Sequence, residues 1–181
     1  VGMRVDGRTI AADKLREFVN ALGLPVLGYL RDTQNYIHLA ARGLTCTTAV
    51  HICYGYGIEA NNKWKETLGH EWRQYEKVFP ALAKSSIQQV SLECMHSHVP
   101  MEMMKLLEGK EVMVGVIDVA NPAIETPEEI ADTIGRALQF VPKNRLIACT
   151  NCGLAPMSRA VAEAKLKALA EGAKLASQRY A

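Results

Sequence analysis

EVMVGVIDV, residues 111–119, is an apolar run with the length and composition of a buried β-strand. A helix start follows it in Thr126-Pro127-Glu128-Glu129, which is a capping box with proline at the first helical position. A second apolar run, NRLIACTNC (144–152), comes after that helix. A strand, a helix and a strand in this order favour a parallel sheet with right-handed crossovers. The expected fold class is therefore α/β.

Two more strands are expected before this unit, in IQQVSLE (87–93) and in TAVHICYG of the 45–57 region. A helix is expected to run through Trp64, Trp72 and Tyr75 and to stop before Pro80, with its aromatic side chains in the core. The last helix is expected near 158–178. Residues 1–44 are expected to form a separate βαβα segment, with strands at 1–6 and 25–30 and helices near 11–22 and 33–42.

About six strands are too few to close an eight-stranded barrel. We therefore expect a partial TIM (β/α) barrel with open sheet edges, and self-association that covers those edges.

Composition limits the class of protein. With 181 residues, 49% hydrophobic and 22% charged, the chain has the size and balance of a globular domain. A formal charge of +2 with dispersed basic residues predicts no nucleic-acid surface. No apolar run reaches the roughly 18 residues that span a bilayer. Five cysteines, an odd number, without a secretory signal favour reduced thiols and a cytoplasmic location.

Potential metal ligands stand at the ends of three of these strands. They are His51, Cys53, Glu93 and Cys152, while the 111–119 strand ends in Asp118. Carboxyl ends of parallel strands meet at one edge of a barrel, where such folds build their sites. Side chains two apart on a strand point the same way, so the His-x-Cys pair can reach one ion. Two thiolates, an imidazole and a carboxylate suit zinc better than magnesium or calcium.

Other interpretations of these residues remain open at this point. A buried cysteine is most often a small core residue, and a strand histidine is often only hydrogen-bonded. Cys149 and Cys152 form a C-x-x-C that could be a redox pair, although no second C-x-x-C completes a zinc knuckle. His98, in the loop after Glu93, could reach the mouth of the site.

A site with two thiolates and a carboxylate leaves electron density on its next ligand. Such a site is suited to holding a substrate thiol as a nucleophilic thiolate, and less suited to making hydroxide. The chemistry that this ligand set indicates is alkylation of a thiol.

From about residue 45 to the end, the chain resembles the C-terminal catalytic domain of cobalamin-independent methionine synthase and its shorter single-domain relatives. The matching stretches are HICYGYG, SLECMHSHVPME, VMVGVIDVANPAIETPEEI and CTNCGLAPMSR. The resemblance implies a TIM barrel and a zinc ion held by His51, Cys53, Glu93 and Cys152. It also implies transfer of a methyl group to homocysteine. The donor would be a methyltetrahydrofolate or, for short relatives, a methyl-corrinoid protein.

Two departures from the family pattern bear on mechanism. Long members carry a histidine after the aspartate of the 111–119 strand, whereas this chain has Asp118-Val119-Ala120, so a proton would come from water or His98. The D-E-P motif, which in the family contributes to the homocysteine amino-group site, does not occur in the chain. We expect the zinc half of the site without its amino-acid half.

Residues 1–44 resemble the late part of a ParA/MinD-type partitioning ATPase, through PVLGYLRDTQNY and AARGLT. No G-K-[ST] phosphate loop precedes them, so we expect no ATP hydrolysis. Two functions then remain open: a zinc-dependent methyltransferase, and a non-catalytic chimeric or truncated zinc-binding fragment. Coenzyme M is a further alternative as the thiol acceptor.

Overall fold

The computed structural model describes residues 43–56, 59–95 and 97–181, together with the single positions 17, 21 and 41. The chain divides into units of residues 1–40 and 41–181, and the second unit is the one described here. The strands and helices expected in residues 1–44 lie outside the described residues.

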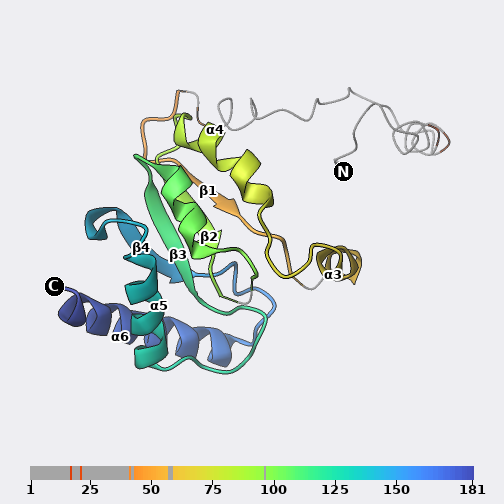
Figure 1. Ribbon diagram of the computed structural model, residues 1–181. Coiled ribbons are helices and arrows are strands. Elements are labelled where there is room, and N and C mark those ends of the chain that lie inside the picture. Colours follow the sequence, from red (N-terminus) through yellow and green to blue (C-terminus); the bar gives the residue numbers. More distant parts are fainter. Residues whose placement is uncertain (1–16, 18–20, 22–40, 42, 57–58, 96) are drawn as a thin grey trace. The chain divides into compact units, whose positions relative to one another are not determined.

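The described unit is built on a four-stranded parallel sheet in the order β1-β2-β3-β4 (Figure 1). The strands are β1 (Ala49–Ile52), β2 (Gln89–Glu93), β3 (Glu111–Ile117) and β4 (Leu146–Thr150). Each occurs within a segment expected from the apolar runs. Sequential order with parallel pairing is the pattern of successive β/α units in a barrel. The expected α/β class with parallel strands is confirmed.

The two faces of the sheet differ in character. One face carries buried valines. Val90 of β2 pairs with Val112 of β3, Val114 lies two residues further along β3, and all three are almost fully buried. The alternate positions include His51, Ser91 and Met113, which pair with one another across β1, β2 and β3. Because side chains alternate along a strand, the row of His51, Ser91 and Met113 lies on the face opposite the buried valines.

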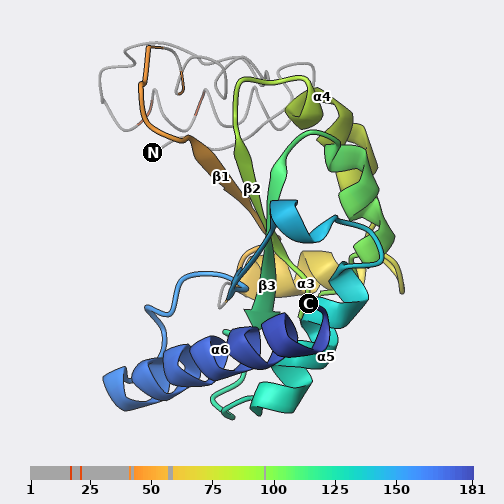
Figure 2. The same ribbon diagram turned by 90° about the vertical axis from the view of Figure 1, so that its left-hand side faces the viewer.

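Helices α5 (Pro127–Ala137) and α6 (Arg159–Arg179) pack against each other and against β3. Figure 2 shows α5 on the same side of the sheet as α4 (Phe79–Ala83). The expected capping box is present: the Thr126 hydroxyl accepts from the Glu129 N–H, and the Glu129 carboxylate accepts from the Thr126 N–H. Gly172 lets the two helices approach, since a Cβ there would lie 2.5 Å from Ile130.

The single helix expected through Trp64, Trp72 and Tyr75 is wrong. The structure has three short helices there: α3 (Glu59–Glu66), the 3₁₀ helix η1 (Gln74–Lys77) and α4. Gly69, with φ of +76°, takes a left-handed conformation between them, and Pro80 lies in the first turn of α4 rather than after a helix end. Trp72 and Tyr75 are nonetheless buried, as expected, whereas Trp64 is 46% exposed.

The remaining elements are the 3₁₀ helices η2 (Met101–Leu107) and η3 (Lys143–Arg145). In the described part of the chain, no helix has the length and apolar character needed to cross a membrane. Strands β1 and β4 are the outer strands of the described sheet. Self-association through such edges stays a prediction.

Candidate metal centre

Three of the expected ligand residues meet at the carboxyl edge of the sheet. The ligand atoms of His51, Cys53 and Cys152 all lie within 4.8 Å of one another. His51 belongs to β1, Cys53 follows that strand, and Cys152 follows β4. The Sγ atoms of Cys53 and Cys152 are 3.9 Å apart. Outer strands β1 and β4 thus direct soft ligands to one point.

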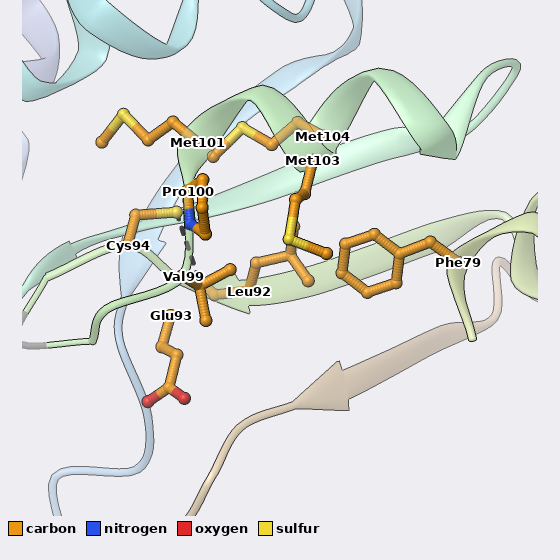
Figure 3. Close-up of a pocket in the computed structure, with 9 residues that line it drawn as sticks. All are labelled: Phe79, Leu92, Glu93, Cys94, Val99, Pro100, Met101, Met103 and Met104. Atoms are coloured by element: carbon orange, nitrogen blue, oxygen red, sulfur yellow. Dashed lines mark hydrogen bonds between the residues drawn. The ribbon is translucent and has the colours of Figure 1, made fainter. Parts of the chain in front are cut away.

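Glu93, the last residue of β2, is not part of that group of three. The residue is 2% exposed, and its carboxylate accepts two hydrogen bonds, from the Tyr54 backbone N–H at 2.8 Å and from the Tyr56 hydroxyl at 2.6 Å. Figure 3 shows this carboxylate directed away from the methionine side chains of η2. Glu93 therefore faces the segment that follows Cys53.

The cavity behind Glu93 is apolar and small. It is lined by Phe79, Leu92 and the methionines of η2, and its volume is about 10 Å³ (Figure 3). That volume is about the space of one water molecule, which excludes a substrate. Its polar neighbour, the Cys94 thiol, donates to the Leu92 carbonyl oxygen, and burial raises the pKa of that thiol to about 12. The high pKa indicates that Cys94 is an unreactive thiol.

His51 has a polar partner on the neighbouring strand. Its Nδ1 lies 3.0 Å from the Ser91 hydroxyl, which in turn lies 3.9 Å from the Cys149 sulfur. His51 and Ser91 are register partners between β1 and β2. Hydrogen-bond partners of this kind orient metal-binding histidines and fix which ring nitrogen carries the proton.

Burial and the Glu93 charge raise the pKa values of one thiol and two phenol groups around the site. Burial raises the pKa of the Cys53 thiol, and the nearby Cys152 sulfur and Glu93 carboxylate raise it further. Burial, followed by the hydrogen bond to Glu93, raises the pKa of Tyr56 far above its usual range. Burial together with the Glu93 charge raises the pKa of Tyr54 to about 12. A nearby cation acts in the opposite direction, because a positive charge favours the ionised form of such groups.

Asp118 and His98 are not members of the group of three ligand residues. Asp118 follows β3, donates its N–H to Glu125, and accepts from the Ala120 N–H. His98 is exposed, and its ring packs on Trp72 with centroids 5.1 Å apart. The structure does not bring these two side chains into the cluster, and their expected contact with substrate stays a prediction.

Sequence reasoning missed several residues that hold the site together, namely Tyr54, Tyr56, Ser91 and Asn151. Tyr56 and Asn151 lie inside the quoted stretches HICYGYG and CTNCGLAPMSR, but only their neighbours were assigned a role. For Asn151 the sequence did hold a signal, because a polar residue directly after an apolar strand and next to a candidate ligand indicates a place in the site.

The fold and this cluster define a class: a parallel α/β protein with a group of histidine and cysteine side chains, of types that bind soft metals, at the carboxyl edge of its sheet. A match to the family described as the catalytic domain of cobalamin-independent synthases covers residues 72–175. The chain belongs to the family of cobalamin-independent methionine synthase catalytic domains.

Individual relatives agree with this assignment. The chain is 30% identical over 141 residues to a methionine synthase of Saccharolobus islandicus, and 28% identical to one of Saccharolobus solfataricus, covering 77% of this chain and 37% of each relative. A structure of a B12-independent methionine synthase from Shewanella sp. W3-18-1, in complex with selenomethionine, matches with a TM-score of 0.75 and 58% identity. That match covers 80% of this chain and 42% of the other.

The structural match confirms the expected partial barrel. The chain spans less than half the length of each of these relatives. None of these matches supports the resemblance of residues 1–44 to partitioning ATPases.

Proposed function

We propose that the chain binds a zinc ion through His51, Cys53 and Cys152 and uses it to activate a thiol for methylation. The observation that carries this proposal is the convergence of these three ligand atoms at the carboxyl edge of the sheet. Two sulfur ligands and an imidazole favour zinc over cations that prefer oxygen.

The spacing of the sulfur atoms fits such an ion. Two thiolates on a tetrahedral zinc, each about 2.3 Å from the metal, lie roughly 3.8 Å from each other. The Cys53 and Cys152 sulfurs lie 3.9 Å apart. This agreement supports a shared metal ligand role for the two cysteines over a C-x-x-C redox role for Cys149 and Cys152.

Glu93 is proposed as the fourth ligand. Each of its oxygens accepts one hydrogen bond, and a carboxylate oxygen has two lone pairs, so acceptor capacity remains for a cation. An oxygen ligand is the one most readily exchanged for a soft substrate thiolate at zinc, because zinc holds sulfur well.

The proposed acceptor is homocysteine and the product methionine. Zinc, when bound, supplies the Lewis acidity that lowers the pKa of a substrate thiol. The sulfur of homocysteine attacks the methyl carbon of the donor, the carbon–donor bond breaks, and the electron pair leaves with the donor. The selenomethionine of the Shewanella protein supports an amino acid with a side chain of this kind.

The chain's own residues supply charge and position. The Cys53 and Cys152 thiolates and the Glu93 carboxylate keep the site negative and the bound sulfur nucleophilic. Asp118, at the end of β3, is proposed to contact the substrate, and His98 to supply a proton to the donor. The donor is a methyltetrahydrofolate or a methyl-corrinoid protein, and a nucleic acid or a membrane is not required.

The test is methionine formation from homocysteine with each donor in turn, using the zinc-loaded chain. Cys53→Ser should abolish turnover, while Cys46→Ser, at an exposed cysteine outside the site, should retain it. One bound zinc without turnover from any donor would instead favour the non-catalytic metal-binding alternative.

A further inference from the structure

The buried amide of Asn151 lies between the ends of three strands. Asn151 directly follows β4, is 0% exposed, and immediately precedes Cys152. Its backbone N–H donates to the carbonyl oxygen of Ile117 at the end of β3. Its side chain reaches the segments that follow β1 and β2.

Every hydrogen-bonding position of this amide is used. Oδ1 accepts from the backbone N–H groups of Cys94 and Met95, and Nδ2 donates to the Met95 carbonyl oxygen and to the Tyr56 hydroxyl. An asparagine side chain offers two donors and an acceptor oxygen with two lone pairs, so its capacity is filled. A fully satisfied buried network fixes one conformation, whereas a partly satisfied one is costly.

The network has one direction and ends at Glu93. Asn151 Nδ2 donates to the Tyr56 hydroxyl at 2.5 Å, and the same hydroxyl donates to Glu93 Oε2 at 2.6 Å. Because the amide hydrogen occupies a lone pair of the hydroxyl, the hydroxyl hydrogen is directed to the carboxylate. The Tyr56 hydroxyl thus links the Asn151 amide to the Glu93 carboxylate.

The sheet makes room for this amide at Gly115. Gly115 pairs with Glu93 on one side and with Cys149 on the other. A Cβ at this position would lie 2.6 Å from Asn151 Oδ1 and 2.7 Å from the Leu92 carbonyl oxygen. Glycine is therefore needed for the close approach of the Asn151 side chain, and not for an unusual backbone angle.

We infer that Asn151 and Tyr56 are positioning residues that hold Glu93 in place for the metal. This inference rests on the proposed zinc site. It assigns to the two residues a role that acts through Glu93 and not through contact with an ion or a substrate. Residues that form hydrogen bonds to metal ligands typically contribute about 10–100-fold to metal affinity.

The experiment is a double-mutant cycle on metal binding to the full chain. Co²⁺ and Zn²⁺ affinities, and the visible bands of the Co²⁺ form, are measured for wild type, Tyr56→Phe, Glu93→Gln and the double variant. Tyr56→Phe removes only a hydroxyl and keeps the aromatic ring, so it is a conservative replacement for the fold. Tyr75→Phe is the matched control, because among the described residues its buried hydroxyl has no hydrogen-bond partner.

Tyr56→Phe should weaken binding by about 10–100-fold and shift the Co²⁺ bands, and Tyr75→Phe should do neither. In the Glu93→Gln background, Tyr56→Phe should weaken binding little further, because its effect passes through Glu93. Asn151→Ala should change the metal affinity in the same way as Tyr56→Phe, both in wild type and in Glu93→Gln.

An unchanged affinity and spectrum in Tyr56→Phe would overturn the inference while leaving the zinc site standing. Equal weakening in both backgrounds would also overturn it, since that result indicates a general structural role. A wild-type chain that binds no metal would overturn the inference and the proposed function together.

Discussion

The sulfur atoms of Cys53 and Cys152 lie 3.9 Å apart, although 99 residues separate the two cysteines in the chain. They come together because β1 and β4 run parallel at the two sides of one twisted sheet, and both residues follow the carboxyl ends of those strands. The position of either cysteine alone does not show whether it is a metal ligand or a core thiol. Their convergence beside His51 is what favours a metal centre.

Zinc affinity should rise with pH. The pKa of the Cys53 thiol is raised, chiefly by burial, so this thiol carries its proton at neutral pH in the metal-free chain. Binding as thiolate must release that proton, and each proton released strengthens binding about tenfold per pH unit below the pKa. Competition titrations with a chelator between pH 6 and 8 measure the slope. A pH-independent affinity would mean that Cys53 is not a ligand.

Ser91→Ala should weaken zinc binding by about 10–100-fold, because the His51 ring loses the hydroxyl that orients it. The measurement is the zinc dissociation constant. Ser91→Thr keeps a hydroxyl and should restore most of the affinity. Ser86→Ala, at an exposed serine in the preceding loop, is the control. Equal affinities for Ser91→Ala and Ser86→Ala would remove Ser91 from the account.

Lys165→Met should destabilise the fold strongly. The Lys165 ammonium is 0% exposed and pairs with the Glu125 carboxylate, which is 10% exposed and also accepts the Asp118 N–H. Removing one partner of a buried pair leaves an uncompensated charge and costs about 3–5 kcal/mol. Urea unfolding monitored by circular dichroism gives the free energy of unfolding.

The double variant Lys165→Met/Glu125→Gln tests the reason for that loss. It removes both charges, so it should be more stable than Lys165→Met alone. A double variant that is less stable than either single variant would show that packing, and not the unpaired charge, dominates.

Thr126→Ala should lower the free energy of unfolding by about 1 kcal/mol, because the first turn of α5 loses its side-chain cap. Urea unfolding measures the change. The control is Thr47→Ala, at an exposed threonine outside any helix, which should have little effect. An equal loss in both variants would argue against a specific contribution of the cap.

The parts of the fold that were predicted correctly are those encoded locally. The capping box needs only residues 126–129, and the apolar runs of β2, β3 and β4 carry their own signal. The single helix expected through Trp64 and Trp72 does not form, because Gly69 takes a left-handed conformation within the segment, and Pro80 begins α4 instead of following a helix end.

The convergence of three candidate ligands at one point was predictable from the sequence, while their role as metal ligands stays a prediction. His51, Cys53 and Cys152 belong to residue types that bind zinc, so their strand-end positions were informative. Asn151 and Tyr56 are common residues whose role depends on contacts between positions 95 residues apart, and no local pattern encodes those contacts. Their contacts form only when the sheet brings the strand ends together.

The zinc content of the purified chain, compared with that of Cys152→Ser, tests the central claim most directly. Cys46→Ser, at an exposed cysteine outside the cluster, is the matched control. About one zinc per chain in wild type and Cys46→Ser, lost in Cys152→Ser, is the predicted result. Zinc absent from the wild-type chain, or retained in full by Cys152→Ser, would contradict the assignment of His51, Cys53 and Cys152 as a metal centre.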